Sequence, residues 1–194
     1  MDLYDKVPKP GRAQHRNTSY TEEEYEIEFG KFVAAFVDDR VGGGLPPKLI
    51  QGCTYASADG DWGKHFGPLV SKWSSQMASV SLHRYATSTC SGKPVPVEEL
   101  LADAATSGKV DAYRNRINAA LAAGVPFVIG EGNTASCGGQ AGVSDTLAAA
   151  IWSLDFLPTL SKAGARRMNF HGGPGGPYPP IAFEKGSLQT RPLY

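Results

Sequence analysis

Apolar residues recur along this chain at two spacings, and each spacing predicts a different kind of element. From Tyr25 to Phe36 they recur every three or four residues, which is the spacing of one face of a helix. The preceding stretch Thr21-Glu22-Glu23-Glu24 has the pattern of a capping box, in which a hydroxyl and a carboxylate satisfy backbone amides at a helix start. We therefore expect a helix from here to about Arg40, preceded by a polar loop over residues 1–19.

Downstream of that helix, strand-like segments alternate with helical ones. The strands are expected at residues 48–56, 77–87, 125–130 and 165–170, and the helices at 62–75, within 95–123 and at 145–163. Ser144 is expected to cap the last helix, Pro158 to kink it, and Gly124 and Gly164 to end the two helices that precede strands. Strands that alternate with helices are typical of a parallel sheet, so the sequence predicts an α/β fold built from βα units.

Polar and aromatic side chains gather where the expected strands end. Because the carboxyl ends of parallel strands meet at one edge of a sheet, we expect these side chains to contribute to one site. They are Tyr55, His83, Tyr85, Glu131, Asn133 and His171.

Glu131 is the member of this set that packing explains least. It follows the apolar run 125–129 and lies between Gly130 and Gly132, and glycines permit close backbone approach and unusual backbone angles. A carboxylate in this position is suited to face a substrate. It could also cap the following helix or pair with an arginine.

The other candidates have structural alternatives too. His83 and Tyr85 share one face of a strand, where they could contact a substrate or fill the core. His171 precedes two glycines and has the same two interpretations. Tyr178 lies in the Gly/Pro-rich segment 171–180 and could bind a ligand or anchor its loop.

Composition and motifs narrow the possible functions. The 194 residues carry 19 basic and 19 acidic side chains, so no charge excess suggests nucleic acid or an anionic membrane as a partner. No apolar run approaches the roughly 20 residues of a membrane-spanning helix. The sequence contains no GxSxG, phosphate-loop or GxGxxG motif, and its three cysteines lack the spacing of a zinc site. We therefore expect carboxylate chemistry without a cofactor or metal.

Three long motifs, in this order, resemble glycoside hydrolase family 79, which includes β-glucuronidases and heparanase. They are "HRYATSTC" at 83–90, "GEGNTASCGGQAGVSDTLAAAIWSLDFL" at 130–157 and "RMNFHGG" at 167–173. The resemblance is strongest to fungal β-glucuronidase-like members and covers almost the whole chain. The family's catalytic domain is a (β/α)8 barrel with an appended β-sandwich. The resemblance implies that residues 1–194 form a single partial barrel domain containing the fifth to eighth strands, without the β-sandwich.

The resemblance also implies roles for the candidate residues. Glu131 would be the nucleophile of a retaining β-glucuronidase, forming a glycosyl-enzyme ester that water then hydrolyses. His83 and Tyr85 would line the sugar subsite, with Asn133 beside the nucleophile. Tyr178 would lie in the loop that recognises the glucuronate carboxylate.

The family's second carboxylate, the acid/base, lies in an Asn-Glu-Pro motif at the end of the fourth strand. No Asn-Glu-Pro triplet occurs in the sequence, although residues 2–12, "DLYDKVPKPGR", resemble the stretch that follows this motif. We therefore expect hydrolysis of natural glucuronides to be lost or very slow unless a partner supplies the acid. The alternative is a non-catalytic carbohydrate-binding or interaction protein on the same scaffold.

A half-barrel alone would have two open sheet edges and an uncovered apolar face. A homodimer or a partner chain could close it into a full barrel, or it could persist as an open sheet. Cys90 and Cys137 fall in consecutive strand-end loops of the resemblance and could form a disulfide, with Cys53 left single. The intact family is usually secreted or lysosomal, whereas the charged, Pro-rich start of this chain does not resemble a signal peptide, so its location stays open.

Overall fold

The computed structural model describes residues 20–37, 48–56, 60–173, 175–184 and 186–190. The expected loop at 1–19 and the last residues of the first expected helix, 38–40, lie outside these ranges. The helices and strands follow one another as α1 (Glu22–Val37), β1 (Ile50–Tyr55), α3 (Gly60–Trp73), β2 (Met77–Ser88), the 3-10 helices η2 (Val97–Leu101) and η3 (Asp103–Ala105), α4 (Ser107–Asp111), α5 (Arg114–Ala122), β3 (Phe127–Ser136), α6 (Leu147–Lys162), β4 (Arg167–Phe170), β5 (Ile181–Glu184) and β6 (Ser187–Thr190).

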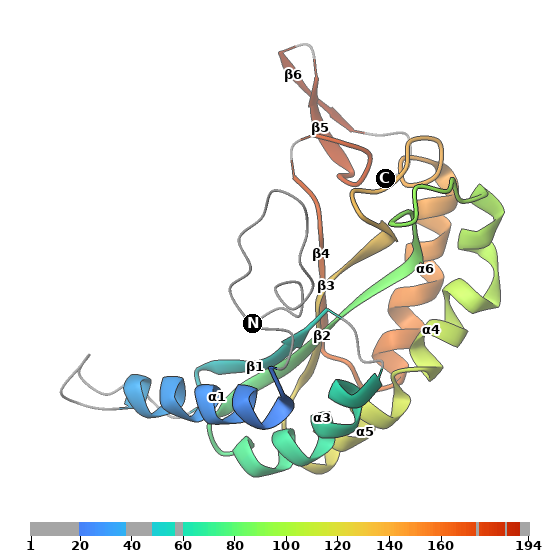
Figure 1. Cartoon of the computed structure of the whole chain (residues 1–194). Coiled ribbons are helices and arrows are strands. Elements are labelled where there is room, and N and C mark those ends of the chain that lie inside the picture. Colours follow the sequence, from blue (N-terminus) through green and yellow to red (C-terminus); the bar gives the residue numbers. More distant parts are fainter. Residues whose placement is uncertain (1–19, 38–47, 57–59, 174, 185, 191–194) are drawn as a thin grey trace. The chain divides into compact units, whose positions relative to one another are not determined.

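The first four strands form one sheet in the order β1-β2-β3-β4, and helices follow each of the first three (Figure 1). β1 pairs with β2 in parallel. The Val80 amide donates to Pro126 and the Thr89 amide to Ser136, so the offset between β2 and β3 is nearly constant, as in parallel strands. The predicted α/β architecture with a parallel sheet is confirmed. It is consistent with part of a (β/α)8 barrel.

The chain divides into two compact units, residues 1–83 with 118–128 and residues 84–117 with 129–194. In the first unit, α1 begins with the predicted capping box. The Thr21 amide donates to the Glu24 carboxylate over 2.8 Å, and the Glu24 amide donates to Thr21 Oγ1 over 3.2 Å. Tyr25, Phe29 and Val33 are buried on one face of this helix. Two other members of the apolar stripe, Phe32 and Phe36, are exposed and retain 54% and 50% of their surface.

The core of the first unit is largely aromatic. The Tyr55 ring contacts those of Tyr25 and Trp62 edge-on, and Phe29 contacts Trp73 in the same way. Such edge-to-face pairs add to the free energy gained from burial. Tyr55 is 1% exposed, so it belongs to this core. Burial also raises the pKa of Tyr55 above its usual range.

In the second unit, α6 packs against η2 and α4. Trp152 stacks on Phe156 and donates from its indole nitrogen to Ala105 O over 3.0 Å. α6 begins at Leu147, later than expected, with Thr146 as its N-cap residue. The expected cap by Ser144 is wrong because its hydroxyl instead receives hydrogen bonds from Thr134 Oγ1 and the Gln140 amide.

The third strand differs from expectation at its end. It was expected to stop at Gly130, but β3 continues through Glu131 to Ser136. Its backbone stays paired on both sides, because Ser136 O accepts from the Thr89 amide and Gly132 O accepts from the His171 amide over 2.9 Å. Glu131 therefore lies within a strand, which holds its backbone more firmly than a loop would.

The close backbone approach expected beside Glu131 is present at Gly132. A Cβ atom on this residue would lie 2.1 Å from the carbonyl oxygen of Arg84, closer than atoms can approach. Neither Gly130 nor Gly132 has a positive φ, so the unusual backbone angles considered from the sequence are not found. Gly132 is thus a packing requirement of the β2–β3 contact.

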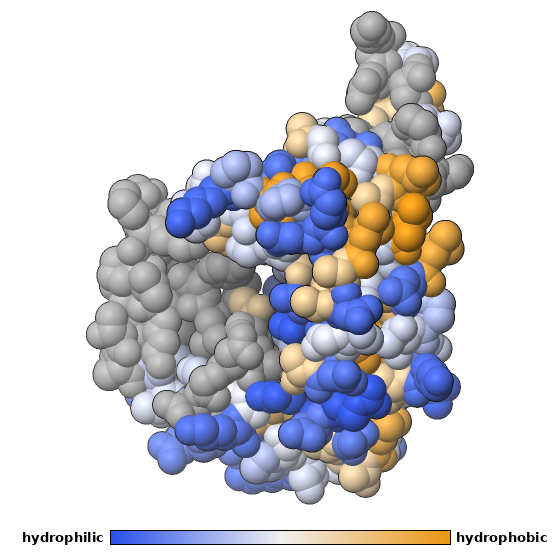
Figure 2. Space-filling model, turned by 90° about the vertical axis from the view of Figure 1, so that its right-hand side faces the viewer, coloured by the Kyte–Doolittle hydropathy of each residue, from blue (hydrophilic) through white to orange (hydrophobic). Residues whose placement is uncertain are grey.

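The antiparallel hairpin formed by β5 and β6 was not predicted from the sequence. Its strands have four residues each and expose Ile181, Phe183 and Leu188. Exposed apolar side chains also occur on α6, where Leu147, Ile151 and Leu154 are 62%, 46% and 75% exposed. Apolar side chains are conspicuous on the face of the molecule seen in Figure 2. In the described part of the chain, no helix is both long enough and apolar enough to cross a membrane.

Candidate active site

Glu131 and Tyr85 form the centre of the candidate site, in the second unit. Glu131 lies on β3 with 33% of its side chain exposed, and Tyr85 lies on the neighbouring strand β2. The Tyr85 hydroxyl donates to Glu131 Oε1 over 2.6 Å. A distance this short is typical of a hydrogen bond to an ionised carboxylate. The pair therefore holds one carboxylate oxygen in a fixed position.

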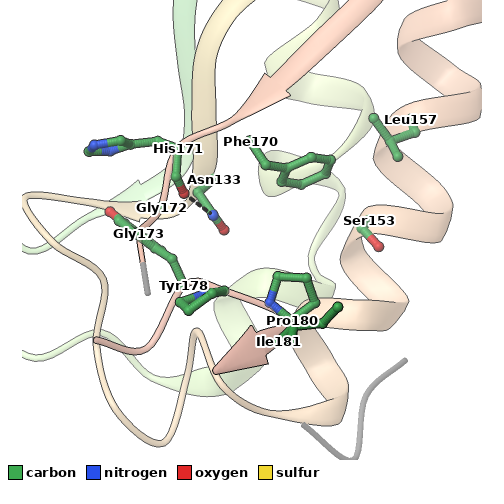
Figure 3. A pocket seen from close by; sticks show the side chains of 11 residues that line it. Asn133, Ser153, Leu157, Phe170, His171, Gly172, Gly173, Tyr178, Pro180 and Ile181 are labelled. Carbon is green, nitrogen blue, oxygen red and sulfur yellow. Dashed lines mark hydrogen bonds between the residues drawn. The ribbon is translucent and has the colours of Figure 1, made fainter. Parts of the chain in front are cut away.

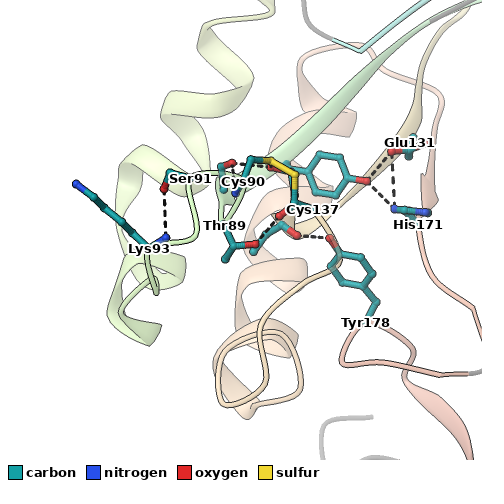
Figure 4. The surroundings of a disulfide bond; sticks show 12 residues. Thr89, Cys90, Ser91, Lys93, Glu131, Cys137, His171 and Tyr178 are labelled. Carbon is teal, nitrogen blue, oxygen red and sulfur yellow. Dashed lines mark hydrogen bonds and ion pairs between the residues drawn. A yellow bond between two sulfur atoms is a disulfide. The ribbon is translucent and has the colours of Figure 1, made fainter. Parts of the chain in front are cut away.

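His171 completes the cluster from the residue directly after β4. Its Nδ1 lies 2.7 Å from the Tyr85 hydroxyl oxygen and 3.8 Å from Glu131 Oε1 (Figure 4). The imidazole ring is half exposed, and its backbone amide is fixed by the bond to Gly132 O. Three adjacent strands thus bring Tyr85, Glu131 and His171 together, as the sequence predicted from their places near strand ends.

Asn133 supports this cluster through the backbone. It is 5% exposed, its Nδ2 donates to His171 O over 2.7 Å, and its Oδ1 accepts from the Thr134 amide over 2.8 Å. Both ends of the amide group therefore bind main chain, which fixes the start of the loop after β4. A direct contact between Asn133 and substrate stays a prediction.

Tyr178 anchors the same loop from its other end. It is 8% exposed, and its hydroxyl donates to Ala135 O. Its ring packs beside the His171 ring, with centroids 5.6 Å apart, and a Cβ on Gly139 would lie 2.8 Å from it. Tyr178 therefore anchors its loop, as one of the two alternatives predicted. Recognition of a glucuronate carboxylate by Tyr178 stays a prediction.

His83 lies in the first unit and is 7% exposed. This burial is consistent with the alternative in which the His83 side chain fills the core instead of contacting a substrate. Its proposed part in a sugar subsite stays a prediction.

A disulfide joins the loops that follow β2 and β3 (Figure 4). The pair is Cys90–Cys137, with a Cα–Cα distance of 5.2 Å, and the remaining cysteine, Cys53, is a buried free thiol. The side chain of Gln140 adds a second connection, because its Oε1 accepts from the Val95 amide and its Nε2 donates to Val95 O. These two links fix the loops that follow the strands carrying Tyr85 and Glu131.

A cavity of about 450 Å³ lies between the loop after β4 and α6 (Figure 3). Leu157, Phe170, Pro180 and Ile181 give it mainly apolar walls. The His171 ring points away from it in Figure 3, and Glu131 does not line it. The cavity therefore adjoins the cluster through His171, Asn133 and Tyr178, which contribute to its wall, but the Glu131 carboxylate does not face it.

Among the described residues, no group of three His, Cys, Asp or Glu side chains is placed to hold a metal ion. The chemistry that the cluster can perform with its own groups is nucleophilic attack or proton transfer by a carboxylate whose orientation is fixed by hydrogen bonds.

The sequence placed these residues near one edge of the sheet, but it gave no sign of the link from His171 through Tyr85 to Glu131. That link depends on how three strands align, which hydropathy patterns do not encode. The connection through Gln140 was missed for the same reason. Its only signal was a glutamine in a Gly-rich loop, which is not specific.

Comparisons with known proteins support a partial relationship to β-glucuronidases. No family model matches the chain. A β-glucuronidase of Neurospora crassa is 30% identical over 118 residues, which cover 58% of this chain and 21% of that protein. The chain thus spans about a fifth of the length of this curated relative.

A solved structure is similar in fold. It is a 4-O-α-L-rhamnosyl-β-D-glucuronidase from Fusarium oxysporum 12S in complex with Rha-GlcA, with a TM-score of 0.57 and 21% identity over 79% of this chain and 32% of that chain. The resemblance to β-glucuronidases, first suggested by the motifs, is thus confirmed as a partial one: sequence similarity to one β-glucuronidase over 118 residues, and similarity of fold to a second glucuronidase.

Proposed function

We propose that this chain carries the nucleophile part of a retaining glycoside hydrolase site that acts on glucuronide-type carbohydrates, with Glu131 as the nucleophile. The observation that carries the proposal is the 2.6 Å hydrogen bond from Tyr85 to Glu131, within a half-exposed cluster on adjacent parallel strands. The partial identity to a Neurospora crassa β-glucuronidase supports the substrate class.

The proposed first step is attack by a Glu131 carboxylate oxygen on the anomeric carbon of the sugar. The bond from that carbon to the aglycone oxygen breaks, and the leaving oxygen takes a proton from an acid. Water then cleaves the resulting glycosyl ester and releases the sugar with its original configuration.

We further propose that the acid/base lies outside these 194 residues, which contain no Asn-Glu-Pro triplet. A second copy of the same 194 residues would add another nucleophile but not this motif, so the acid comes from a different segment of polypeptide. General acid–base assistance is typically worth about 10²- to 10⁴-fold in rate, so the chain by itself is expected to be slow on natural glycosides.

The second candidate is carbohydrate binding without turnover. The two candidates differ in one measurable property. A nucleophile part forms a covalent bond to an activated sugar, whereas a binding protein holds it only reversibly.

The experiment is intact-mass analysis after incubation with 2,4-dinitrophenyl 2-deoxy-2-fluoro-β-D-glucuronide. This leaving group needs little acid assistance, so a missing acid does not hide a working nucleophile. The expected result is a single adduct that maps to Glu131, absent in Glu131→Gln and present in Glu98→Gln, a control at an exposed glutamate of the same unit. A folded protein that binds the reagent reversibly but forms no adduct would support the second candidate.

The matching 2-fluoro glucoside tests the substrate class. It lacks the carboxylate but keeps the same leaving group. Adduct formation that is much slower with the glucoside supports a glucuronide site, and equal rates would contradict it.

A further inference from the structure

Hydrogen-bond geometry in the Tyr85 cluster determines where its protons lie. The Tyr85 hydroxyl has a single proton and contacts two groups at hydrogen-bond distance, Glu131 Oε1 at 2.6 Å and His171 Nδ1 at 2.7 Å. One proton cannot serve both contacts. Glu131 acts as a nucleophile only when ionised, and an ionised carboxylate can only accept hydrogen bonds. The hydroxyl proton therefore points to Glu131.

The contact to His171 then requires a proton on the imidazole. With the hydroxyl proton directed at Glu131, Nδ1–H must donate to the Tyr85 oxygen. In the opposite arrangement Tyr85 would donate to Nδ1, leaving two oxygens 2.6 Å apart with no proton between them unless Glu131 were protonated and inactive. The 3.8 Å separation of Nδ1 and Glu131 Oε1 is too long for a direct hydrogen bond, so His171 acts on the carboxylate through Tyr85.

We propose that His171 is a positioning residue that holds Tyr85 in its productive orientation as the Nδ1–H tautomer, and that its Nε2 accepts a hydrogen bond from a sugar hydroxyl. Within the part of the chain that the structure describes, the polar side-chain contacts of His171 all involve Nδ1, and half of the side chain is exposed. A neutral imidazole protonated at Nδ1 presents a lone pair at Nε2. Such a nitrogen attracts a hydroxyl and repels a carboxylate, so His171 would select for the hydroxyl side of the sugar.

This role in the reaction rests on the proposed function, but the tautomer can be measured without any reaction. The probe is ¹⁵N NMR of the full chain with labelled histidine, in which the protonated and bare ring nitrogens resonate far apart. The chain has four histidines, and the signals of His171 are identified by their loss in His171→Asn. We expect the Nδ1–H tautomer in the wild type and a change to the Nε2–H tautomer in Tyr85→Phe.

Tyr178→Phe is the matched control for the NMR measurement. It removes another hydroxyl near the His171 ring, but that hydroxyl bonds Ala135 O, so the Nδ1–H tautomer should persist. An Nε2–H tautomer in the wild type, or the same change in both tyrosine variants, would overturn the proposal.

The second test uses the kinetics of adduct formation to separate the positioning role of His171 from a merely structural role of its side chain. In His171→Asn the side-chain amide can take the place of Nδ1–H but not of Nε2. The maximal rate of inactivation should stay within about threefold, while the half-saturating reagent concentration rises. In His171→Leu both interactions are lost, and the maximal rate should fall by about 10-fold, the upper end of the typical effect of losing one neutral hydrogen bond.

Equal maximal rates in the two variants would overturn the positioning role. If the wild type forms no adduct while NMR shows the Nδ1–H tautomer, the proposed function fails and the hydrogen-bond assignment stands. The two failures are thus distinguishable.

Discussion

The Tyr85 hydroxyl fixes the Glu131 carboxylate through a bond that the sequence could not show. A hydrogen bond to a charged group is worth about 1.5–3 kcal/mol, or roughly 10- to 150-fold in a rate. We expect Tyr85→Phe to slow formation of the Glu131 adduct by about that factor while the chain stays folded. Time-resolved intact mass with the 2-fluoro glucuronide measures the rate.

The matched control for this substitution is Tyr20→Phe. Tyr20 also donates from its hydroxyl to a glutamate, Glu28 Oε2, over 2.8 Å, but it belongs to the first unit. Its loss should leave the adduct rate within about twofold. A Tyr85→Phe rate equal to that of the wild type would show that this bond does not orient the nucleophile.

Gly132 is a residue whose replacement should affect folding. An alanine Cβ would overlap the Arg84 carbonyl oxygen, so β2 and β3 would have to separate at this point. We expect Gly132→Ala to lower the free energy of unfolding by about 2 kcal/mol or more, since overpacking usually costs about 1–3 kcal/mol. Urea denaturation followed by circular dichroism measures it. Gly173→Ala, which meets no atom within 4 Å, should change stability by less than about 0.5 kcal/mol.

At the scale of single residues, the sequence predicted which side chains would meet but not how they bond. Tyr85, Glu131 and His171 were expected together because parallel strands end at one edge. A close backbone approach beside Glu131 was also predicted, and it occurs at Gly132. The exposure of Phe32 was not, because helical spacing fixes a direction around the axis and says nothing of how far the packing partner extends.

Helix α1 offers a prediction at the scale of elements. Two reciprocal hydrogen bonds between Thr21 and Glu24 satisfy its first amides. Removing such a cap typically costs about 1 kcal/mol. We expect Thr21→Ala to lower the free energy of unfolding by about this amount and to speed amide hydrogen exchange in the first turn of α1. Lys31→Ala, at an exposed position of the same helix, should leave the free energy of unfolding and the amide exchange rates equal to those of the wild type within experimental error.

The order of helices and strands could be predicted well from periodicity, and their ends less well. β3 extends past Gly130 because its ladder continues to β2 and β4, although small polar residues there look like a loop. Ser144 has the chemistry of a cap, yet a tertiary contact with Thr134 recruits its hydroxyl. The β5–β6 hairpin is too short to show a clear alternation. In each case a contact between distant residues decided the outcome.

The cysteines give a prediction for the whole molecule. Cys90 and Cys137 are paired, and burial raises the pKa of the Cys53 thiol to about 12, so the native chain should show almost no reactive thiol at pH 8. In denaturant without reductant, one thiol per chain should react with Ellman's reagent. Two or more reactive thiols in denaturant would contradict the pairing.

The same thiol makes stability depend on pH in the alkaline range. The pKa of Cys53 rises from its ordinary value of 9.0 to about 12 on folding, so the native state keeps a proton that the unfolded state loses. The contribution of Cys53 is present below about pH 9 and declines as the pH rises toward 12. Cys53→Ala should flatten this decline in urea midpoints measured from pH 8 to 10.

For the molecule as a whole, the sequence specified the fold class but not the surroundings of its apolar surface. Alternating strands and helices predicted the parallel sheet. α6 is apolar over most of its circumference, and such helices are usually covered, yet Leu147, Ile151 and Leu154 are exposed in this chain. What covers them depends on other polypeptide surfaces, which one sequence does not contain.

The Cys90–Cys137 bond closes residues 90–137 into a covalent ring, and Glu131 is a member of it. A protease that cut the backbone once anywhere inside the ring, for example at the exposed Arg114, would leave a single covalent molecule instead of two fragments. The strand that carries Glu131 would keep a chemical link to the strand that carries Tyr85. A nicked chain would therefore migrate as one species without reductant and separate only when the disulfide is reduced.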